Sequence, residues 1–273
     1  MLIALATKHE KEKIFEPIFS SLGWELRLSE IDTDQFGTFS GEIERKLTPR
    51  DTAIAKAKAA ANAAGLSRAV ASEGSVGPHP QIPFINADLE WVAYVDLDTG
   101  LELVESVVSS DIVAFQTPYQ DGLDISAVMK KADLPEHALI AKAESDFGIW
   151  AMKGLRSRGD IENAIAQASE LGILSSLVFE SDFRAMCSPS RQRNIKACVE
   201  KLVKRLEIRC PACQSRGFGL VDFERGVACR DCGEISMTAV RAEIHGCLLC
   251  SHREVRENGL TTISPALCQA CNP

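Results

Sequence analysis

Four C-x-x-C pairs constrain the last quarter of the chain more than any other feature. Eight of the ten cysteines lie in these pairs, all of them after residue 209. In a reducing compartment this spacing is typical of metal binding rather than of disulfides. Each C-x-x-C turn directs two thiolates at one ion, and the segment between two pairs brings the second pair back to it. Because so short a segment buries little apolar surface, we expect the metal to supply its folding energy.

The cysteines predict two structural zinc sites with four thiolate ligands each. The spacing is C-x2-C-x15-C-x2-C over residues 210–232 and C-x2-C-x17-C-x2-C over residues 247–271. Sequential pairing is the simplest closure, and it gives one ribbon from Cys210, Cys213, Cys229 and Cys232 and another from Cys247, Cys250, Cys268 and Cys271. The alternative is an interleaved arrangement that pairs the first and third C-x-x-C turns. A site closed by four thiolates is expected to be structural rather than catalytic.

We assign residues 207–273 to these tandem zinc ribbons. Their arginines alternate with acidic residues, and the whole chain has a net charge of -8. This mixture favours a stabilising tail, a homodimer contact or a protein partner over a nucleic-acid backbone.

The length of 273 residues leaves room for one medium domain before this module. The apolar run that opens the chain is too short for the core of a signal peptide, and no run is long enough to cross a membrane. We therefore predict a cytoplasmic protein with no membrane partner. For residues 1–206 we predict an α/β domain, with a mixed sheet flanked by helices.

Residues 48–77 read as a helix, a tight turn and a buried strand. Thr48 is a good N-cap, and Gly65 is a typical helix end. Gly74 and Ser75 are expected to break the strand directly after Glu73. This arrangement places Asp51 at a helix start and Glu73 at a strand end, where the two carboxylates could share a divalent cation. The alternative explanation for Asp51 is a capping box, in which the acid only stabilises the helix.

A second candidate region follows the buried strand predicted over residues 2–6. A polar loop and a helix start come next, and this order is common in phosphate binding because free N–H groups and the helix dipole point at the anion. Thr7, His9, Lys11 and Lys13 are the candidate phosphate-binding residues here. The alternative is a solvated helix start with alternating charges.

The segments DTAIAKAKAAANAAG and VASEGSVG resemble the inosine triphosphate pyrophosphatase superfamily and its inosine/xanthosine triphosphatase branch. The resemblance implies that Asp51 and Glu73 hold magnesium and handle the attacking water, and that Lys56 is the helix lysine. Thr52 stands where the family usually has Asn. The family's Thr-x-Asn-x-x-Lys loop matches at Thr7, whereas His9 replaces Asn and the lysines flank the expected position.

The resemblance extends to about residue 117, through a hairpin predicted over residues 88–110. Within it, Asp88 and Glu90 could add to a metal site, but we expect them to face solvent on an edge strand. Further along we predict helices over 124–132 and 160–171, strands over 137–143 and 173–179, and a helix opened by Ser188 and Pro189. The family's Ser-His-Arg segment, which contacts the base, is similar to the chain around Arg191. Arg184 and Arg191 are therefore candidate substrate-binding residues.

These observations lead to one main functional expectation. The chain is expected to hydrolyse a nucleoside triphosphate to the monophosphate and pyrophosphate, with Mg²⁺ held by Asp51 and Glu73. Lys11 or Lys13, together with Lys56, would neutralise the phosphates. The alternative is a nucleotide-binding sensor without catalysis, whose zinc ribbons dock a protein or nucleic-acid partner. A third interpretation is a structural zinc protein without a ligand.

Overall fold

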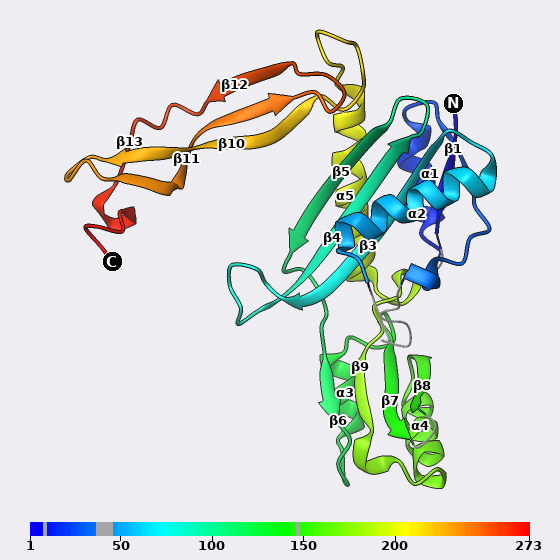
Figure 1. Cartoon of the computed structure of the whole chain (residues 1–273). Coiled ribbons are helices and arrows are strands. Elements are labelled where there is room, and N and C mark those ends of the chain that lie inside the picture. The colour runs from blue at the N-terminus through cyan, green and yellow to red at the C-terminus, as the bar shows by residue number, and fades with distance from the viewer. Residues whose placement is uncertain (8–9, 37–45, 146–147) are drawn as a thin grey trace. The chain divides into compact units, whose positions relative to one another are not determined.

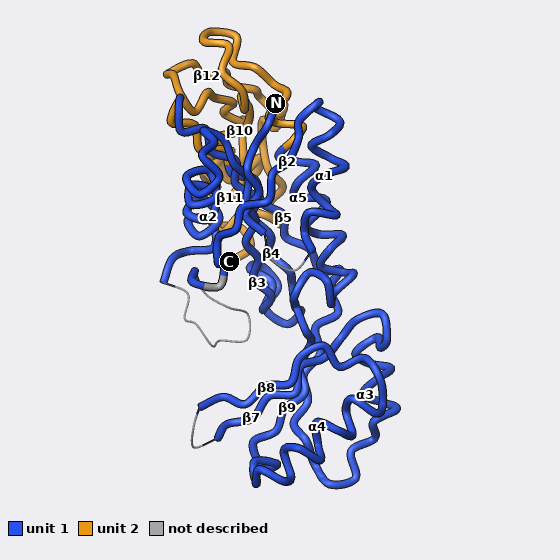
Figure 2. The backbone as a smooth tube through the Cα atoms, turned by 90° about the vertical axis from the view of Figure 1, so that its right-hand side faces the viewer, with its two compact units in different colours: residues 1–98, 104–202 blue, residues 99–103, 203–273 orange. Residues whose placement is uncertain are grey.

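The computed structural model describes residues 1–7, 10–36, 46–145 and 148–273. The described chain forms two compact units, coloured separately in Figure 2. The first unit comprises residues 1–98 and 104–202, and the second comprises residues 99–103 and 203–273. Figure 1 traces the order of the elements along the chain.

The first sheet has five strands in the order β2-β1-β3-β4-β5. Its strands are β1 (Leu2–Ala6), β2 (Glu25–Leu28), β3 (Arg68–Pro78), β4 (Asn86–Asp96) and β5 (Leu101–Ser109). β1 runs parallel to both β2 and β3, and β3 runs antiparallel to β4. The predicted α/β class, with a mixed sheet flanked by helices, is therefore confirmed for this part of the chain.

Helix α2 (Pro49–Ala64) lies against one face of this sheet. The side chain of Thr48 accepts a hydrogen bond from the Asp51 N–H, and Gly65 ends the helix with a φ of 63°. A stripe of small residues lets the helix approach the strands closely, and it consists of Ala53, Ala57, Ala60 and Ala61, all fully buried. The first unit also contains α1 (Glu12–Ser20) and most of α5 (Pro189–Glu207), whose residues after Leu202 belong to the second unit. A 3-10 turn, η1, spans Thr33–Phe36.

The prediction that β3 ends after Glu73 was wrong. The strand continues for five residues and pairs with β4 throughout, with Gly74 opposite Glu90 and Val76 opposite Asp88. Gly74 is not a strand breaker here. A Cβ at this position would lie 2.4 Å from Nη2 of Arg191 and 2.5 Å from Oε1 of Glu90, so the glycine makes room for these two side chains.

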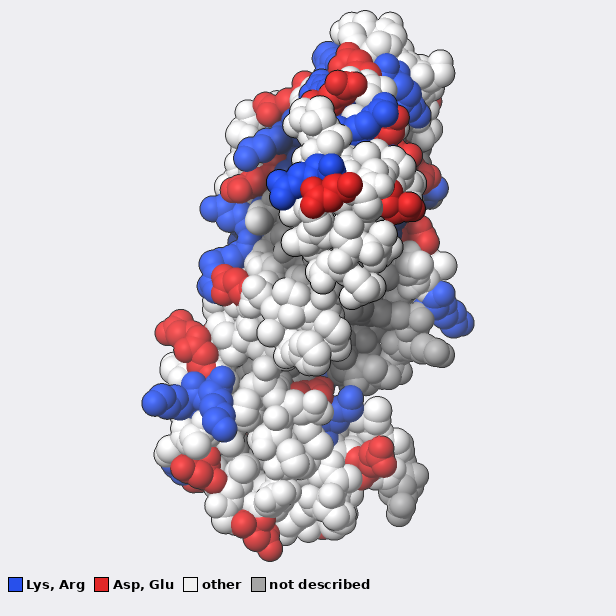
Figure 3. All heavy atoms as spheres, turned by 90° about the vertical axis from the view of Figure 1, so that its left-hand side faces the viewer, with Lys and Arg blue, Asp and Glu red and all other residues white. Residues whose placement is uncertain are grey.

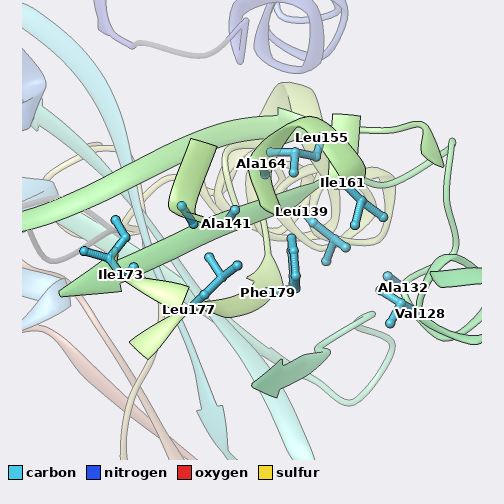
Figure 4. Packing of buried hydrophobic residues seen from close by; sticks show 12 residues of the cluster. Val128, Ala132, Leu139, Ala141, Leu155, Ile161, Ala164, Ile173, Leu177 and Phe179 are labelled. Atoms are coloured by element: carbon cyan, nitrogen blue, oxygen red, sulfur yellow. The ribbon is translucent and has the colours of Figure 1, made fainter. Parts of the chain in front are cut away.

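The first unit contains a second, antiparallel sheet that follows the order β6-β9-β7-β8. Its elements are β6 (Gln116–Pro118), α3 (Ile125–Lys131), β7 (Leu139–Ser145), β8 (Gly148–Leu155), α4 (Arg158–Glu170), η2 (Leu174–Ser176), β9 (Val178–Ser181) and η3 (Ala185–Cys187). Residues of β7, β9 and α4, among them Leu139, Phe179 and Ile161, pack into one core (Figure 4). The strand predicted over residues 173–179 was wrong, because its first part forms η2 and β9 begins only at Val178.

The second unit is built on a four-stranded sheet with the order β12-β11-β10-β13. Its elements are β10 (Gly219–Cys229), β11 (Ile235–Gly246), β12 (Arg253–Glu257), β13 (Thr262–Ile263) and η4 (Pro265–Leu267). β10 and β11 form a long antiparallel hairpin, and β12 pairs antiparallel with β11. Across the described ranges, every helix is too short or too polar to cross a lipid bilayer.

Candidate functional site

Lys11 lies at the start of α1, shortly after β1 ends. Its Nζ donates a hydrogen bond to Oγ of Ser72 on β3, over 3.0 Å. Burial of the ammonium group, followed by the positive charge of Arg191, lowers the pKa of Lys11 to about 8. Lys13 is exposed and pairs with Glu10 instead. Of the two predicted lysines, only Lys11 faces the sheet.

Lys56 and Glu73 form a buried ion pair between α2 and β3. Nζ of Lys56 lies 2.6 Å from Oε2 of Glu73. Thr52 precedes Lys56 by one helical turn, and its buried hydroxyl has no hydrogen-bond partner among the described residues. The predicted helix lysine and the predicted strand acid therefore do come together, and a buried polar hydroxyl lies beside them on the helix.

These side chains lie beyond the carboxyl end of β1. The last paired residue of β1 is Ala6, which lies opposite Ala71 of β3. Ser72 and Glu73 thus extend past β1, and the chain that leaves β1 leads to Lys11. Ligands of open α/β sheets bind at such carboxyl ends. The region beyond the carboxyl end of β1, which holds Lys11, Ser72, Lys56 and Glu73 and is called the sheet edge below, is therefore the candidate site of the first unit, even though β3 continues past it.

Asp51 has the environment of a capping residue. Its Oδ2 accepts a hydrogen bond from the Thr48 hydroxyl at 2.7 Å, and its Oδ1 pairs with the exposed Arg50. Lys56 lies five residues further along α2, which is about 140° around the helix from Asp51. In this structure each predicted metal-binding acid has a protein partner of its own, Thr48 and Arg50 for Asp51 and Lys56 for Glu73.

A second polar cluster lies on the face of β3 and β4 that carries Ser72, opposite to the face that carries Glu73. Nε of Arg191 lies 2.5 Å from Oε1 of Glu90, and Nδ2 of Asn194 donates to Oδ2 of Asp88 at 3.0 Å. Burial raises the pKa of Glu90 to about 7, although Arg191 opposes the shift, and burial also raises the pKa of Asp88. Oε2 of Glu90 and Oδ1 of Asp88 are buried and accept no hydrogen bond from the described residues.

The expectation that Asp88 and Glu90 face solvent on an edge strand was wrong. β4 lies between β3 and β5, and both acids are fully buried. One sequence signal was available, because the two acids alternate with Leu89 and Trp91 at strand spacing. That pattern indicates a polar face, but only the helix that covers it distinguishes a buried polar face from a solvated one.

The other predicted substrate-binding residues have different environments. Arg191 is 1% exposed within the cluster just described. Arg184 contacts both carboxylate oxygens of Asp182, at 2.9 Å and 2.5 Å. Thr7 follows β1 and is half-buried, whereas the prediction for His9 lies outside the described residues.

A cavity of about 550 Å³ adjoins the Arg191 cluster. Its walls come from the ends of β3 and β4, the segment 114–116 and β9, and include Val76, Asn86, Phe115, Glu180 and Phe183. The carbonyl oxygen of Phe183 accepts a hydrogen bond from Nη1 of Arg191, which connects the cavity wall to the buried ion pair. The cavity is large enough for a small molecule.

Asp133, His137 and Ser190 form a hydrogen-bonded series in the first unit. Nδ1 of His137 lies 2.9 Å from Oδ2 of Asp133, and Nε2 lies 2.9 Å from Oγ of Ser190. The order resembles a nucleophilic triad, but Ser190 is fully buried and its Oγ accepts a hydrogen bond from the Val113 N–H. We therefore interpret the series as an anchor for the start of α5.

The second unit brings the eight predicted cysteines into two groups. One comprises Cys210, Cys213, Cys247 and Cys250, and the other comprises Cys229, Cys232, Cys268 and Cys271. The pairing is thus interleaved, and the simpler sequential closure was wrong. The reason is the long β10–β11 hairpin, which separates the first C-x-x-C pair from the second and returns the chain to the first at Cys247.

Both groups have dimensions that suit zinc. A tetrahedral ion with Zn–S bonds of about 2.3 Å sets its sulfur atoms about 3.8 Å apart. The Sγ–Sγ distances are 3.7 Å for Cys210 and Cys250 and 3.9 Å for Cys229 and Cys271. Burial opposes ionisation of Cys247, but hydrogen bonds from Ser215 and from backbone N–H groups lower its pKa to about 6. In the same group, the backbone N–H of His252 favours ionisation of Cys250, but burial and the neighbouring thiols outweigh it and raise the pKa of Cys250 to about 12. Each group could hold one zinc ion.

Comparison with known proteins identified one family. Residues 56–273 match the model described as domain of unknown function DUF6671, a span that begins at Lys56 and includes all eight zinc-site cysteines. The comparisons with curated proteins and with solved structures gave no match. Since this model covers well over half of the sequence, the chain belongs to the DUF6671 family.

Proposed function

We propose that the first unit is a metal-dependent nucleoside triphosphate pyrophosphohydrolase with an ITPase-like fold. The observation that carries the proposal is the contact of Lys11 with Ser72, at the same sheet edge as the buried Lys56–Glu73 pair. A strand, a loop and a helix start that carries a half-buried lysine suit a phosphate group. A carboxylate lies within the same edge, as hydrolysis with a bound metal requires.

Each residue has a distinct role in this proposal. Lys11 and Lys56 would neutralise the phosphate oxygens, and Glu73, now paired with Lys56, would be the carboxylate that holds a magnesium ion. Asp51, which is half-exposed, would supply a second carboxylate after leaving Thr48 and Arg50. When bound, the metal would screen the phosphate charge and make the attacking water more acidic. The zinc ions of the second unit have a structural role.

The test measures pyrophosphate release from a panel of canonical and deaminated nucleoside triphosphates with magnesium. Lys11→Met and Glu73→Gln should each reduce release about 100-fold or more, since each removes a group that balances developing charge. Lys13→Met is the matched control, because Lys13 is exposed and pairs with Glu10, and it should retain full activity. An active Lys11→Met protein, or a wild-type protein that releases no pyrophosphate, would overturn the proposal.

Asp51→Asn separates two forms of the proposal. If Asp51 binds the metal, release falls with this variant as it does with Glu73→Gln. If Asp51 only stabilises the start of α2, activity is retained and the free energy of unfolding falls by about 0.3–1 kcal/mol.

A nucleotide sensor is the second candidate, and the protein partners of Asp51 and Glu73 favour it. Acids held in this way would let the lysines bind phosphate without turnover. Thermal stabilisation of the wild type by nucleotide, lost in Lys11→Met and without pyrophosphate release, would support the sensor.

A further inference from the structure

We propose that β12 pairs with β12 of a second copy of this chain and forms a two-fold symmetric, continuous sheet. β12 is the end strand of the sheet in the second unit, and its only ladder within the described residues is with β11. An end strand presents a row of backbone N–H and C=O groups that can pair with another strand. The sequence of β12 identifies the strand that it fits.

The five residues of β12 read Arg-Glu-Val-Arg-Glu, and their charges are complementary to themselves in reverse. In an antiparallel pair centred on Val255, Arg253 lies opposite Glu257 of the second copy, and Glu254 lies opposite Arg256 of the second copy. The same two pairs recur by symmetry on the other side of the centre. Residues directly opposite each other share a face of the sheet, so all four pairs join opposite charges.

Other registers do not offer this complementarity. A pair centred on Glu254 sets the two Glu254 carboxylates against each other, and a pair centred on Arg256 does the same with two guanidinium groups. A register shifted by one residue places Arg253 opposite Arg256, or Glu254 opposite Glu257. Like charges directly opposite each other are unfavourable, so the sequence selects the register centred on Val255.

The side chains at the centre of β12 are exposed or make contacts within the strand, so they can also contact a second copy. Val255 is 59% exposed, and Arg256 and Glu254 pair with each other on one face at 3.1 Å. In the symmetric sheet these two residues would meet the same two residues of the second copy and form a square of alternating charges. Nη1 of Arg253 is held by the carbonyl oxygens of Cys247 and Cys250, so the Glu254 and Arg256 contacts are expected to carry the specificity.

Charged side chains on an edge strand often discourage pairing with another strand, and like charges that face each other contribute to this. Here one register is attractive. On the side of the molecule that Figure 3 draws, acidic and basic side chains are interspersed and do not gather into an area of one sign. A mixed surface of this kind suits a second copy with the same charges better than a polyanion.

The experiment uses the full zinc-loaded chain and sedimentation equilibrium over a series of protein concentrations. The wild type is expected to be a dimer that dissociates as salt is raised, since the pairs are solvent-exposed. Glu254→Arg and Arg256→Glu should each weaken the dimer at least 10-fold, because each variant places like charges opposite each other. Arg241→Glu, the same charge change on β11, is the matched control and should leave the dimer unchanged.

Two charge-swap experiments, one with a double variant and one with a mixture, make the test specific for this register. The double variant Glu254→Arg with Arg256→Glu restores opposite charges and should dimerise again. An equimolar mixture of the two single variants should form a heterodimer, because one copy then carries two acids where the other carries two arginines. Retention of two zinc ions by each variant would show that the second unit remains folded. A wild-type monomer at all concentrations, or a dimer insensitive to both single variants, would overturn the proposal.

Discussion

Lys56 and Glu73 join α2 to β3 through an ion pair of 2.6 Å that is almost completely buried. A buried pair of this kind is not in itself strong evidence for stability, because both charges have lost their hydration. Its presence beside the packed alanines of α2 and β3 is therefore informative. The pair is a charged contact within an interface of small apolar side chains, and it lies at the same sheet edge as Lys11.

Lys56→Met should destabilise the first unit strongly, because it leaves the Glu73 carboxylate buried without its main counter-ion. We expect the free energy of unfolding to fall by about 3–5 kcal/mol. Urea unfolding followed by circular dichroism measures the change.

The double variant Lys56→Met with Glu73→Leu removes both charges and provides the control. Its stability should return to within about 1 kcal/mol of the wild type, because a matched apolar pair replaces a desolvated ion pair at little cost. If Lys56→Met alone were as stable as the wild type, the pair would not be buried as the structure has it.

The interleaved arrangement of the cysteines gives a prediction about metal content. Cys213→Ser with Cys250→Ser removes two ligands from the same group and should leave one zinc ion per chain. Cys213→Ser with Cys232→Ser removes one ligand from each group, so it should weaken both sites. Metal analysis after dialysis against a mild chelator measures the stoichiometry. Sequential pairing predicts the opposite result: the Cys213 and Cys232 double variant would keep one zinc ion, and the Cys213 and Cys250 double variant would weaken both sites.

Several elements could be predicted because their signals are local. Thr48 and Gly65 delimit α2 through cap chemistry that involves only neighbouring residues. The apolar run at residues 2–6 forms a strand buried in the sheet, and the C-x-x-C spacing identified the cysteines that gather into groups of four. In each case the residues that carry the signal are also the residues that form the structure.

The errors arose where distant residues determine the outcome. The sequence predicts a strand break at Gly74, but Gly74 is part of β3 and leaves room for the side chain of Arg191, which lies more than a hundred residues later in the chain. Glu90 was assigned to solvent because the hairpin pattern does not show that β3 pairs with β4 or that Arg191 of α5 covers this face. The pairing of the cysteine turns likewise depends on the length of a hairpin. Local pattern therefore identified the candidate residues but not which of them would meet.

Gly74→Ala tests the packing of the Arg191–Glu90 pair against β3. The added methyl group would overlap both side chains, so we expect a loss of about 1–3 kcal/mol in the free energy of unfolding. Gly77→Ala on the same strand is the matched control, because a Cβ there meets nothing within 4 Å. It should change stability by less than about 1 kcal/mol in either direction. Equal effects at the two positions in urea unfolding would contradict the tight approach of Arg191.

The lowered pKa of Lys11 gives a prediction about pH and stability. Its pKa falls from 10.5 to about 8 on folding, so between these values the unfolded chain binds more protons than the native one. Stability rises with pH wherever the unfolded state binds more protons, and the contribution of Lys11 should therefore increase the free energy of unfolding from pH 8 toward pH 10.5. Below pH 8 the native state bears the full cost of the buried ammonium group.

Lys11→Met isolates this contribution, since the other titrating groups, including the thiols, remain in both proteins. The free energy of unfolding of both proteins is measured in urea from pH 7.5 to 10. As the pH rises, the value for the wild type should increase relative to the value for Lys11→Met. Lys13→Met should show no such trend between pH 7.5 and 10. The hydrogen bond to Glu10 raises the pKa of Lys13, so Lys13 stays protonated in this pH range. Parallel pH profiles for the wild type and Lys11→Met would mean that Lys11 is solvated, and a solvated lysine would not be poised at the sheet edge for an anion.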